Sequence, residues 1–389
     1  MNSSSPKSIG LIHEILSRLP SKSVARFRCV SKPCASMIGS PYFTELFLTR
    51  SLAKPRLLFA TVKDGVWSFF SSPYYPYEKS SSTFVATAKF HVKFPPNNIR
   101  IGHNKDRRYF SYGYTSGLIY LYGDTYDDRP VICNPYTGEY AILPYLKRYR
   151  KAYSFLVFEP IDKQFKVLFM AYQSGCDRNH KILTVGTGNM KWRTIKFSLG
   201  HEIASEGITI NGVLSEKFTF FEIERFCRLI NYKGKLAMIY FEDDVNYQSF
   251  GYRKEDYVEA NDINELHVWV LEDMEKQKWS KYAYTWTDDI FFRRRHVSVA
   301  PTTAWGEIVF SMCEYTPGQP FYVFYFNPEK NTLQRVEIQG FGEAFCSVYT
   351  FVDNVEDLNV NDLKILKPFN APFVKKKESE SDYSNSDSE

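Results

Sequence analysis

The sequence contains none of the short motifs that mark the common enzyme mechanisms. HExxH, which places a zinc site on a helix, is absent. So are GxSxG, which positions a nucleophilic serine, and the glycine-rich loop that holds nucleotide phosphates. The seven histidines never fall at metal-ligand spacing with one another or with cysteine. We therefore expect no catalytic residue, no cofactor and no metal site, and a protein that is not an enzyme.

Cysteines and long apolar runs are also scarce. The seven cysteines among 389 residues are scattered, odd in number and never form a CxxC pair, which favours reduced thiols over a disulfide framework. No apolar run approaches the roughly 20 residues of a membrane helix, and the first residues, MNSSSPKS, lack an apolar secretory core. The sequence thus predicts a protein of the nucleus, the cytoplasm or both, without a membrane partner.

A strong charge of one sign is missing from the chain as a whole. The net charge of +5 is small for this length and gives no argument for nucleic acid as a partner. Two segments depart from this balance. The run Arg293, Arg294 and Arg295 is a candidate rim for an acidic segment of a protein partner, with solvated loop charge as the alternative interpretation. Residues 371–389 end in ESESDYSNSDSE, an acidic stretch with serines beside carboxylates that predicts a disordered tail.

The helical pattern of the chain is concentrated in its first fifty residues. Pro20 ends a predicted first helix, and Ser21 is predicted to cap a second. Ser31 is predicted to cap a third, and Ser40-Pro41 repeats the signal that ends one helix and starts the next, so three or four short helices are expected. The apolar positions at helical spacing are Leu11, Ile12, Ile15, Leu16 and Leu19 in the first helix and Val24, Phe27 and Val30 in the second.

From residue 55 the pattern changes to short strand-like runs separated by turn residues. Hairpins are predicted around turn centres near residues 136, 187, 274 and 329, which are spaced by about fifty residues or a multiple of it, as in propeller blades. The spacing leaves one further unit to be expected between residues 205 and 250. We therefore expect a flexible terminus (1–8), a helical domain (9–54), a β-propeller-like domain (55–370) and a disordered acidic tail (371–389).

Three segments of this sequence resemble the F-box family, in the form common in plants that carries an F-box-associated domain. They are LIHEILSRLP, KSVARFRCVSK and SPYFTELFLTRS, and a looser similarity extends over most of the remaining chain. The chain departs from the family pattern at Ser8 and Gly10, where a proline and an acidic residue are usual, and at Cys34, where an aromatic is usual. The resemblance implies a multi-domain α+β fold, with a small all-α F-box followed by a large all-β, propeller-like domain.

The same resemblance implies a substrate receptor of an SCF-type cullin-RING ubiquitin ligase. The F-box would bind a Skp-type adaptor and through it a cullin, while the β domain would bind a target protein of unknown identity. The residues implied in the adaptor contact are Leu11, Ile12, Ile15, Leu16, Leu19, Pro20, Val24 and Val30. An alternative is a propeller with a degenerate F-box that binds proteins without a ligase. DNA binding is disfavoured. In the segment 32–38, which would be the recognition helix, only Lys32 and Ser36 have polar side chains that could contact base edges.

Overall fold

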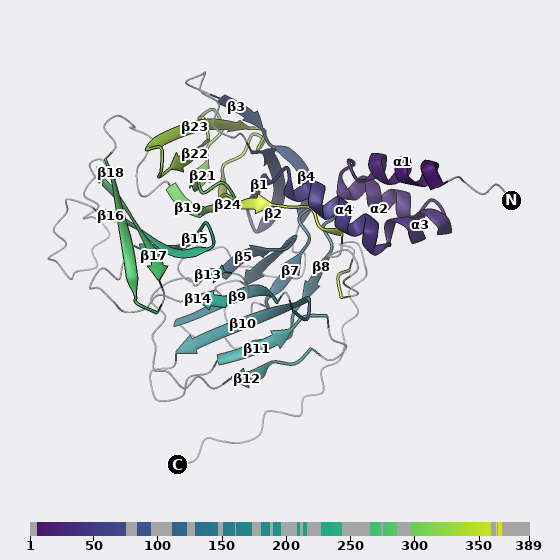
Figure 1. Cartoon of the computed structure of the whole chain (residues 1–389), viewed down its shortest axis with the longest axis horizontal. Coiled ribbons are helices and arrows are strands. Elements are labelled where there is room, and N and C mark those ends of the chain that lie inside the picture. The colour runs from purple at the N-terminus through teal and green to yellow at the C-terminus, as the bar shows by residue number, and fades with distance from the viewer. Residues whose placement is uncertain are drawn as a thin grey trace, which may run out of the picture.

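A computed structural model describes the chain at residues 6–74, 84–94, 111–122, 129–146, 151–159, 161–172, 180–186, 190–195, 208–210, 213–215, 227–242, 265–273, 275–285, 297–358, 363 and 365–367. Within these ranges, no helix has the length and apolar character needed to cross a membrane. The described residues form a group of short helices followed by a large set of strands, and the helices project from one side of the strands (Figure 1).

Four short helices form what we call the helical module: α1 (Pro6–Leu16), α2 (Ser21–Arg28), α3 (Lys32–Ile38) and α4 (Pro41–Leu52). The predicted cap at Ser31 and the predicted start signal at Ser40 are confirmed. The Oγ of Ser31 accepts a hydrogen bond from the backbone N–H of Cys34, and the Oγ of Ser40 accepts one from Phe43, each at 3.3 Å. These bonds satisfy helix N–H groups that have no partner within the helix, so they fix where α3 and α4 begin.

The starts of α1 and α2 differ from the prediction. Helix α1 begins at Pro6, so residues 6–8 are helical rather than part of a flexible terminus; proline suits the first helical position because its missing N–H is not needed there. The N-cap of α2 is Pro20 rather than Ser21, and no side chain of the module caps this helix. Instead, the backbone N–H of Ser21 donates to Oε2 of Glu356 at 2.5 Å, from the far end of the chain.

The strands form five sheets of four or five strands and one sheet of two, within the described residues. The sheet nearest the module has the order β21 (Glu314–Tyr315), β24 (Cys346–Asn354), β1 (Arg56–Lys63), β2 (Val66–Pro73), β4 (Lys89–Phe94). The next two contain β5 (Ser111–Thr115), β6 (Leu118–Tyr122), β7 (Val131–Cys133) and β8 (Tyr140–Ile142), and then β9 (Lys151–Glu159), β10 (Gln164–Tyr172), β11 (His180–Thr184) and β12 (Arg193–Ile195).

The remaining sheets complete the β domain, as we call the strand-bearing part of the chain. One contains β13 (Ile208–Ile210) and β14 (Val213–Ser215); another β15 (Cys227–Tyr232), β16 (Lys235–Glu242), β17 (Glu265–Asp273) and β18 (Lys278–Thr285). The last has the order β19 (Val297–Thr302), β20 (Ile308–Met312), β22 (Tyr322–Asn327), β23 (Thr332–Gln339), β3 (Phe84–Thr87). Figure 1 shows the sheets succeeding one another around the β domain.

The predicted hairpins are confirmed, and the residues of their turns explain why the chain reverses direction there. Strands β7 and β8 are joined by the Asn134 turn, in which the Asn134 side chain accepts hydrogen bonds from the backbone N–H groups of Tyr136 and Thr137. The hairpins β11–β12, β17–β18 and β22–β23 fall at the other predicted turn centres. At Asp64 and Gly65, between β1 and β2, both residues have positive φ, the conformation that matches the twist of a two-residue hairpin.

One sheet, which we call the closing sheet, joins the two ends of the β domain. Strand β24 pairs with β1 in an antiparallel register that runs from Arg56 opposite Asn354 to Val62 opposite Ser347. Such a pairing of first and last strands closes the ring of a propeller. The fold class predicted from the sequence, a small all-α domain followed by a large all-β, propeller-like domain, is confirmed.

The chain attaches the helical module to the β domain at residues that follow β24. Leu358 is buried in the core of the module with Leu16, Val24, Ile38, Phe43 and Phe47. The backbone N–H of Glu356 donates to Oγ of Ser51 at 3.0 Å, while its carboxylate holds the start of α2. The hydroxyl of Tyr114 is within hydrogen-bond distance of both the backbone N–H and the carbonyl of Val355. The module core is therefore completed by the end of the β domain.

Candidate functional site

Helix α1 carries both a buried apolar side chain and several exposed ones. Leu16 is buried in the module core. Leu11, Ile12 and Ile15 lie away from that core and are exposed. Because positions four apart share one side of a helix, Leu11 and Ile15 form a single stripe, with Ile12 beside it. Helix α1 thus packs on the module with one side and presents an apolar stripe to solvent with the other.

The end of α2 adds two more exposed apolar side chains. Val24 is fully buried, whereas Phe27 and Val30 lie in solvent. We call the exposed set the apolar face: Leu11, Ile12, Ile15, Phe27 and Val30, whose exposed fractions range from 41% to 70%. Covering the part of each side chain that is still exposed would contribute on the order of 1 kcal/mol, and five such contributions suit a protein-binding surface.

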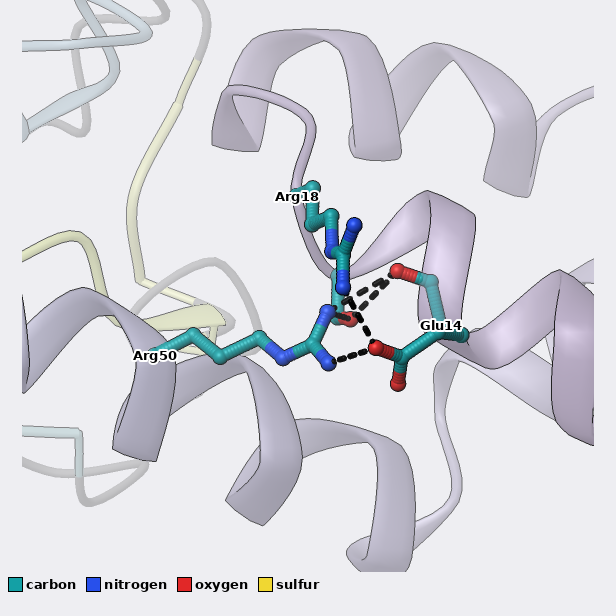
Figure 2. A network of polar contacts seen from close by, with 4 residues as sticks. Glu14, Arg18 and Arg50 are labelled. Carbon is teal, nitrogen blue, oxygen red and sulfur yellow. Dashed lines mark hydrogen bonds and ion pairs between the residues drawn. The ribbon is translucent and has the colours of Figure 1, made fainter.

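A network of charged groups fixes α1 against α4, as Figure 2 shows. Arg50 of α4 reaches across to α1, where its guanidinium donates to the backbone carbonyl of Glu14 at 2.9 Å and to Oγ of Ser17 at 2.6 Å. The same guanidinium forms an ion pair with the Glu14 carboxylate, which Arg18 also contacts at 2.7 Å. These contacts hold the turn of α1 that carries the apolar face in one orientation.

The negative charge of Glu14 and the positive charges of Arg18 and Arg50 favour a stable contact. The hydrogen bond from Arg50 is the largest cause that lowers the pKa of Glu14, and Arg18 acts in the same direction. Glu14 therefore stays ionised at neutral pH, and both arginines remain paired with it. The exposed side chains of Lys22, Arg26 and Lys32 leave the surface of the module basic.

The structure shows which of the residues predicted to enter a partner are exposed. Leu16 and Val24 are buried within the module, because the core of so small a helical group needs them. Leu19 is half-buried and packs against the same core. Pro20 is exposed and sets the start of α2. Of the eight predicted residues, Leu11, Ile12, Ile15 and Val30 belong to the apolar face.

One member of the apolar face was absent from the predicted set. Phe27 lies three residues before Val30 and three after Val24, so its spacing marked it as an apolar position of the second helix. The spacing does not show which of the three side chains is buried. The predicted rim of Arg293, Arg294 and Arg295 and the predicted acidic tail lie outside the described residues. Within the part of the chain that is described, no three potential ligands come together to hold a metal ion.

Comparison with known protein families identifies both parts of the chain. Residues 9–46 match the F-box domain. Residues 56–215 and 213–355 match the F-box associated beta propeller domain in two successive segments. The first range covers most of the helical module and contains the entire apolar face, and the second covers the strands from β1 to β24.

Three proteins of Arabidopsis thaliana illustrate the similarity. The F-box protein At2g23160 is 75% identical over 72% of this chain and 100% of its own length. The F-box protein At2g15640 is 61% identical over 95% of this chain and 97% of its own, and the F-box protein At2g16450 is 58% identical over 97% and 99%. The second and third similarities extend through both the helical module and the β domain.

The longer alignments also show that this chain lacks residues that those relatives contain. The alignment with At2g15640 spans 416 positions, of which about 370 are residues of this chain (95% of 389), so about 46 positions have no counterpart here. That number is close to the roughly 40–50 residues of one propeller repeat. The two segments of the family match meet at residues 213–215, which form β14 of the two-stranded sheet. The shortened unit that the family resemblance implies between residues 205 and 250 stays a prediction, because the alignment length does not locate the unmatched positions.

Proposed function

Because this chain belongs to the family of F-box proteins that carry an F-box associated beta propeller domain, we propose that it is a substrate receptor of an SCF-type ubiquitin ligase. In this role the helical module binds a Skp-type adaptor, which in turn binds a cullin. The β domain binds a target protein. The chain itself catalyses no step, and it acts in the nucleus, the cytoplasm or both.

The observation that carries this proposal is the apolar face. Five apolar side chains on α1 and at or just after the end of α2 are exposed, although the core of the module, which Leu358 completes, is already buried. A helical group of this size has no structural need for a second apolar side, so the surplus fits a partner groove. The basic surface around it suits an acidic adaptor and would speed the encounter of the two proteins.

The proposed mechanism is tethering. A target bound to the β domain is kept near a ubiquitin-conjugating enzyme that is bound elsewhere on the same assembly, which raises the effective concentration of the two reactants. The contacts of Glu356 and Leu358 with the helical module support this mechanism, because they hold the adaptor-binding part and the target-binding part in one orientation. A fixed orientation limits which lysines of the target are within reach.

The proposal is tested by co-purification of the full chain with a plant Skp-type adaptor. We expect wild-type protein to retain the adaptor and the double variant Leu11→Ser, Ile15→Ser to lose most of it. Ile161→Ser is a matched control, because Ile161 is also exposed but lies in the turn between β9 and β10. Failure of the wild type to retain the adaptor, or equal retention by the double variant, would contradict the proposal.

A second candidate function follows from the departures of this F-box from the family pattern. Cys34 replaces the aromatic residue that is usual in the family. If this replacement prevents adaptor binding, the chain would bind proteins without a ligase. The structure nevertheless forms α3 around this position, with Cys34 half-buried. We expect Cys34→Trp to strengthen adaptor binding by adding apolar contact in α3. If neither the wild type nor this variant binds an adaptor, the ligase-independent function is favoured.

A further inference from the structure

The chain that follows Leu358 contacts the β domain a second time. Leu363, Ile365 and Leu366 are half-buried and pack against an apolar cluster to which the sheet of β5–β8 and the sheet of β9–β12 both contribute. The backbone N–H of Leu366 donates to the carbonyl of Leu363 at 3.0 Å, so the segment turns as it crosses this cluster. We call residues 363–367 the strap, of which the structure describes 363 and 365–367.

The strap ends on the edge of a sheet, where Figure 1 shows the yellow segment beside β8. The N–H of Tyr140 in β8 donates to the carbonyl of Lys367 at 3.0 Å, and the N–H of Lys367 donates to the carbonyl of Tyr140 at 2.9 Å. Strand β8 is the last of its sheet, so this antiparallel pair lies on an open edge. The strap therefore binds as an added strand does, through main-chain bonds to an edge and apolar side chains beside it.

The edge of β8 has a second hydrogen-bonding position that the strap does not use. Glu139 and Leu143 both form backbone hydrogen bonds on the side of β7. Because an antiparallel ladder alternates, Tyr140 and Ile142 point their N–H and C=O groups away from β7. Those of Tyr140 bond to Lys367, whereas those of Ile142 have no partner among the described residues. A segment that stayed extended along β8 would gain two backbone hydrogen bonds that the strap lacks.

The two contacts made by the chain after β24 are held unequally. Leu358 is buried in the core of the helical module, and Glu356 bonds to the N–H of Ser21. In the strap the apolar side chains are only half-buried, and Lys367 is exposed. The strap can therefore leave the edge of β8 while Leu358 and Glu356 keep their places in the module.

We propose that the edge of β8 and the apolar surface beside it bind an extended apolar segment of a target protein, and that the strap occupies this surface until such a segment displaces it. The strap itself shows which chemistry the surface accepts: Leu-x-Ile-Leu, followed by a residue whose backbone pairs with Tyr140. A target segment of this pattern that also reaches Ile142 binds more tightly than the strap. The inference rests on the proposed function only in that the β domain binds a target.

The strap competes with a target because it belongs to the same chain. Four residues, 359–362, join it to Leu358. A segment linked so closely acts at an effective concentration on the order of millimolar. Short apolar segments are therefore excluded, and a segment that makes the additional bonds to Ile142 is selected.

The test is fluorescence anisotropy of a labelled peptide of residues 361–370 with the full-length protein. We expect weak binding to the wild type. The double variant Leu363→Asp, Leu366→Asp should bind the peptide about tenfold more tightly, because the competing segment is weakened. Ile161→Asp, at an exposed position of the β9–β10 turn, is the matched control and should bind like the wild type. A peptide that carries the same two aspartates should bind neither protein.

Amide hydrogen exchange locates the binding. In the double variant the N–H of Tyr140 should exchange faster, because its bond to Lys367 is lost, and the peptide should slow it again. The N–H of Ala141, which bonds to β7, is the internal control and should stay protected throughout. A second peptide carries Lys364→Val, because a β-branched residue favours an extended backbone. It should bind the wild type more tightly than the natural peptide does and slow the exchange of Ile142.

Several results would overturn the proposal. Equal affinity of the wild type and the double variant for the peptide, or unchanged exchange at Tyr140, would mean that the surface accepts no segment from another molecule. A melting temperature of the double variant well below that of Ile161→Asp would make the strap a structural part of the β domain. A wild-type dimer in analytical ultracentrifugation would assign the surface to the end of a second copy. No measurement here contains the adaptor, so a failure is distinct from a failure of adaptor binding.

Discussion

Glu307 lies immediately before β20 with its side chain buried. Its backbone closes the turn with Thr303, from which it accepts a hydrogen bond at 2.8 Å, but the carboxylate Oε2 has no hydrogen-bond partner among the described residues. Burial raises the pKa of Glu307 to about 7, although the charge of Lys330 acts in the opposite direction. Ionising this carboxyl group therefore costs folding free energy that an exposed glutamate would not require.

This shift predicts a pH-dependent loss of stability at Glu307. The folded-state pKa lies above the unfolded value of 4.5, so the contribution of Glu307 is fully present below pH 4.5 and is lost as the pH rises through 7. Glu307→Gln removes the ionisation and should raise the free energy of unfolding at pH 8 by about 1–2 kcal/mol, allowing for partial solvent screening. Urea denaturation at pH 8 and at pH 4.5 measures this difference, and equal gains at both values would contradict the assignment.

Residue-scale properties of this kind could be predicted only in part from the sequence. The helix caps at Ser31 and Ser40 were predictable because the hydrogen bonds they make are local. The burial of Glu307, and that of Leu16 rather than Ile15, depends on segments distant in the chain. The hydrophobic pattern shows that α1 is amphipathic. It does not show which of its apolar residues pack in the module core and which remain exposed.

At the scale of elements, the helical module depends on a residue that lies outside the family-defined F-box. Leu358 is buried among Leu16, Val24 and Phe47, more than three hundred residues away in the chain from most of its contacts. The position of α2 likewise depends on Glu356, which supplies the cap that Pro20 cannot provide. No local pattern predicts such contacts, because they arise from the path of the chain after β24.

Leu358→Ala should destabilise the module more than the β domain. Removing a buried leucine leaves a cavity and costs about 2–5 kcal/mol. Amide hydrogen exchange is expected to accelerate in α1 to α4 while the strands of the closing sheet keep their protection. Leu52→Ala, at an exposed position of α4, should leave exchange unchanged. Uniform acceleration across both parts, or none, would show that Leu358 does not belong to the module core.

At the scale of the whole molecule, closure of the β domain depends on aromatic contacts between sheets. Tyr349 of β24 stacks on Trp67 of β2 with ring centroids 5.5 Å apart, and it also contacts Tyr112 of β5 at 4.7 Å. It therefore connects the closing sheet to the next sheet of the domain. The hairpins and their spacing were predictable from turn residues, whereas the pairing of β24 with β1 joins segments with no sequence signal that relates them.

Tyr349→Ala tests whether closure stabilises the molecule as one unit. Loss of a large buried aromatic side chain should lower the free energy of unfolding by about 3–5 kcal/mol. Because β24 stays paired with β1 in this variant, thermal unfolding should remain a single transition at lower temperature. Phe345→Ala, an exposed aromatic just before β24, is the control and should have little effect. Two separate transitions in the Tyr349 variant would mean that the sheets unfold independently.

The most direct test of the proposed receptor function is a calorimetric titration of the full chain with a plant Skp-type adaptor. Wild-type protein should give saturable binding with a negative heat-capacity change, as expected when apolar surface is buried. Ile15→Glu places a charge in the apolar face and should weaken the affinity at least tenfold, whereas Ile161→Glu, in the β9–β10 turn, should bind like the wild type. Absence of binding by the wild type, or an unchanged affinity of the Ile15 variant, would contradict the account.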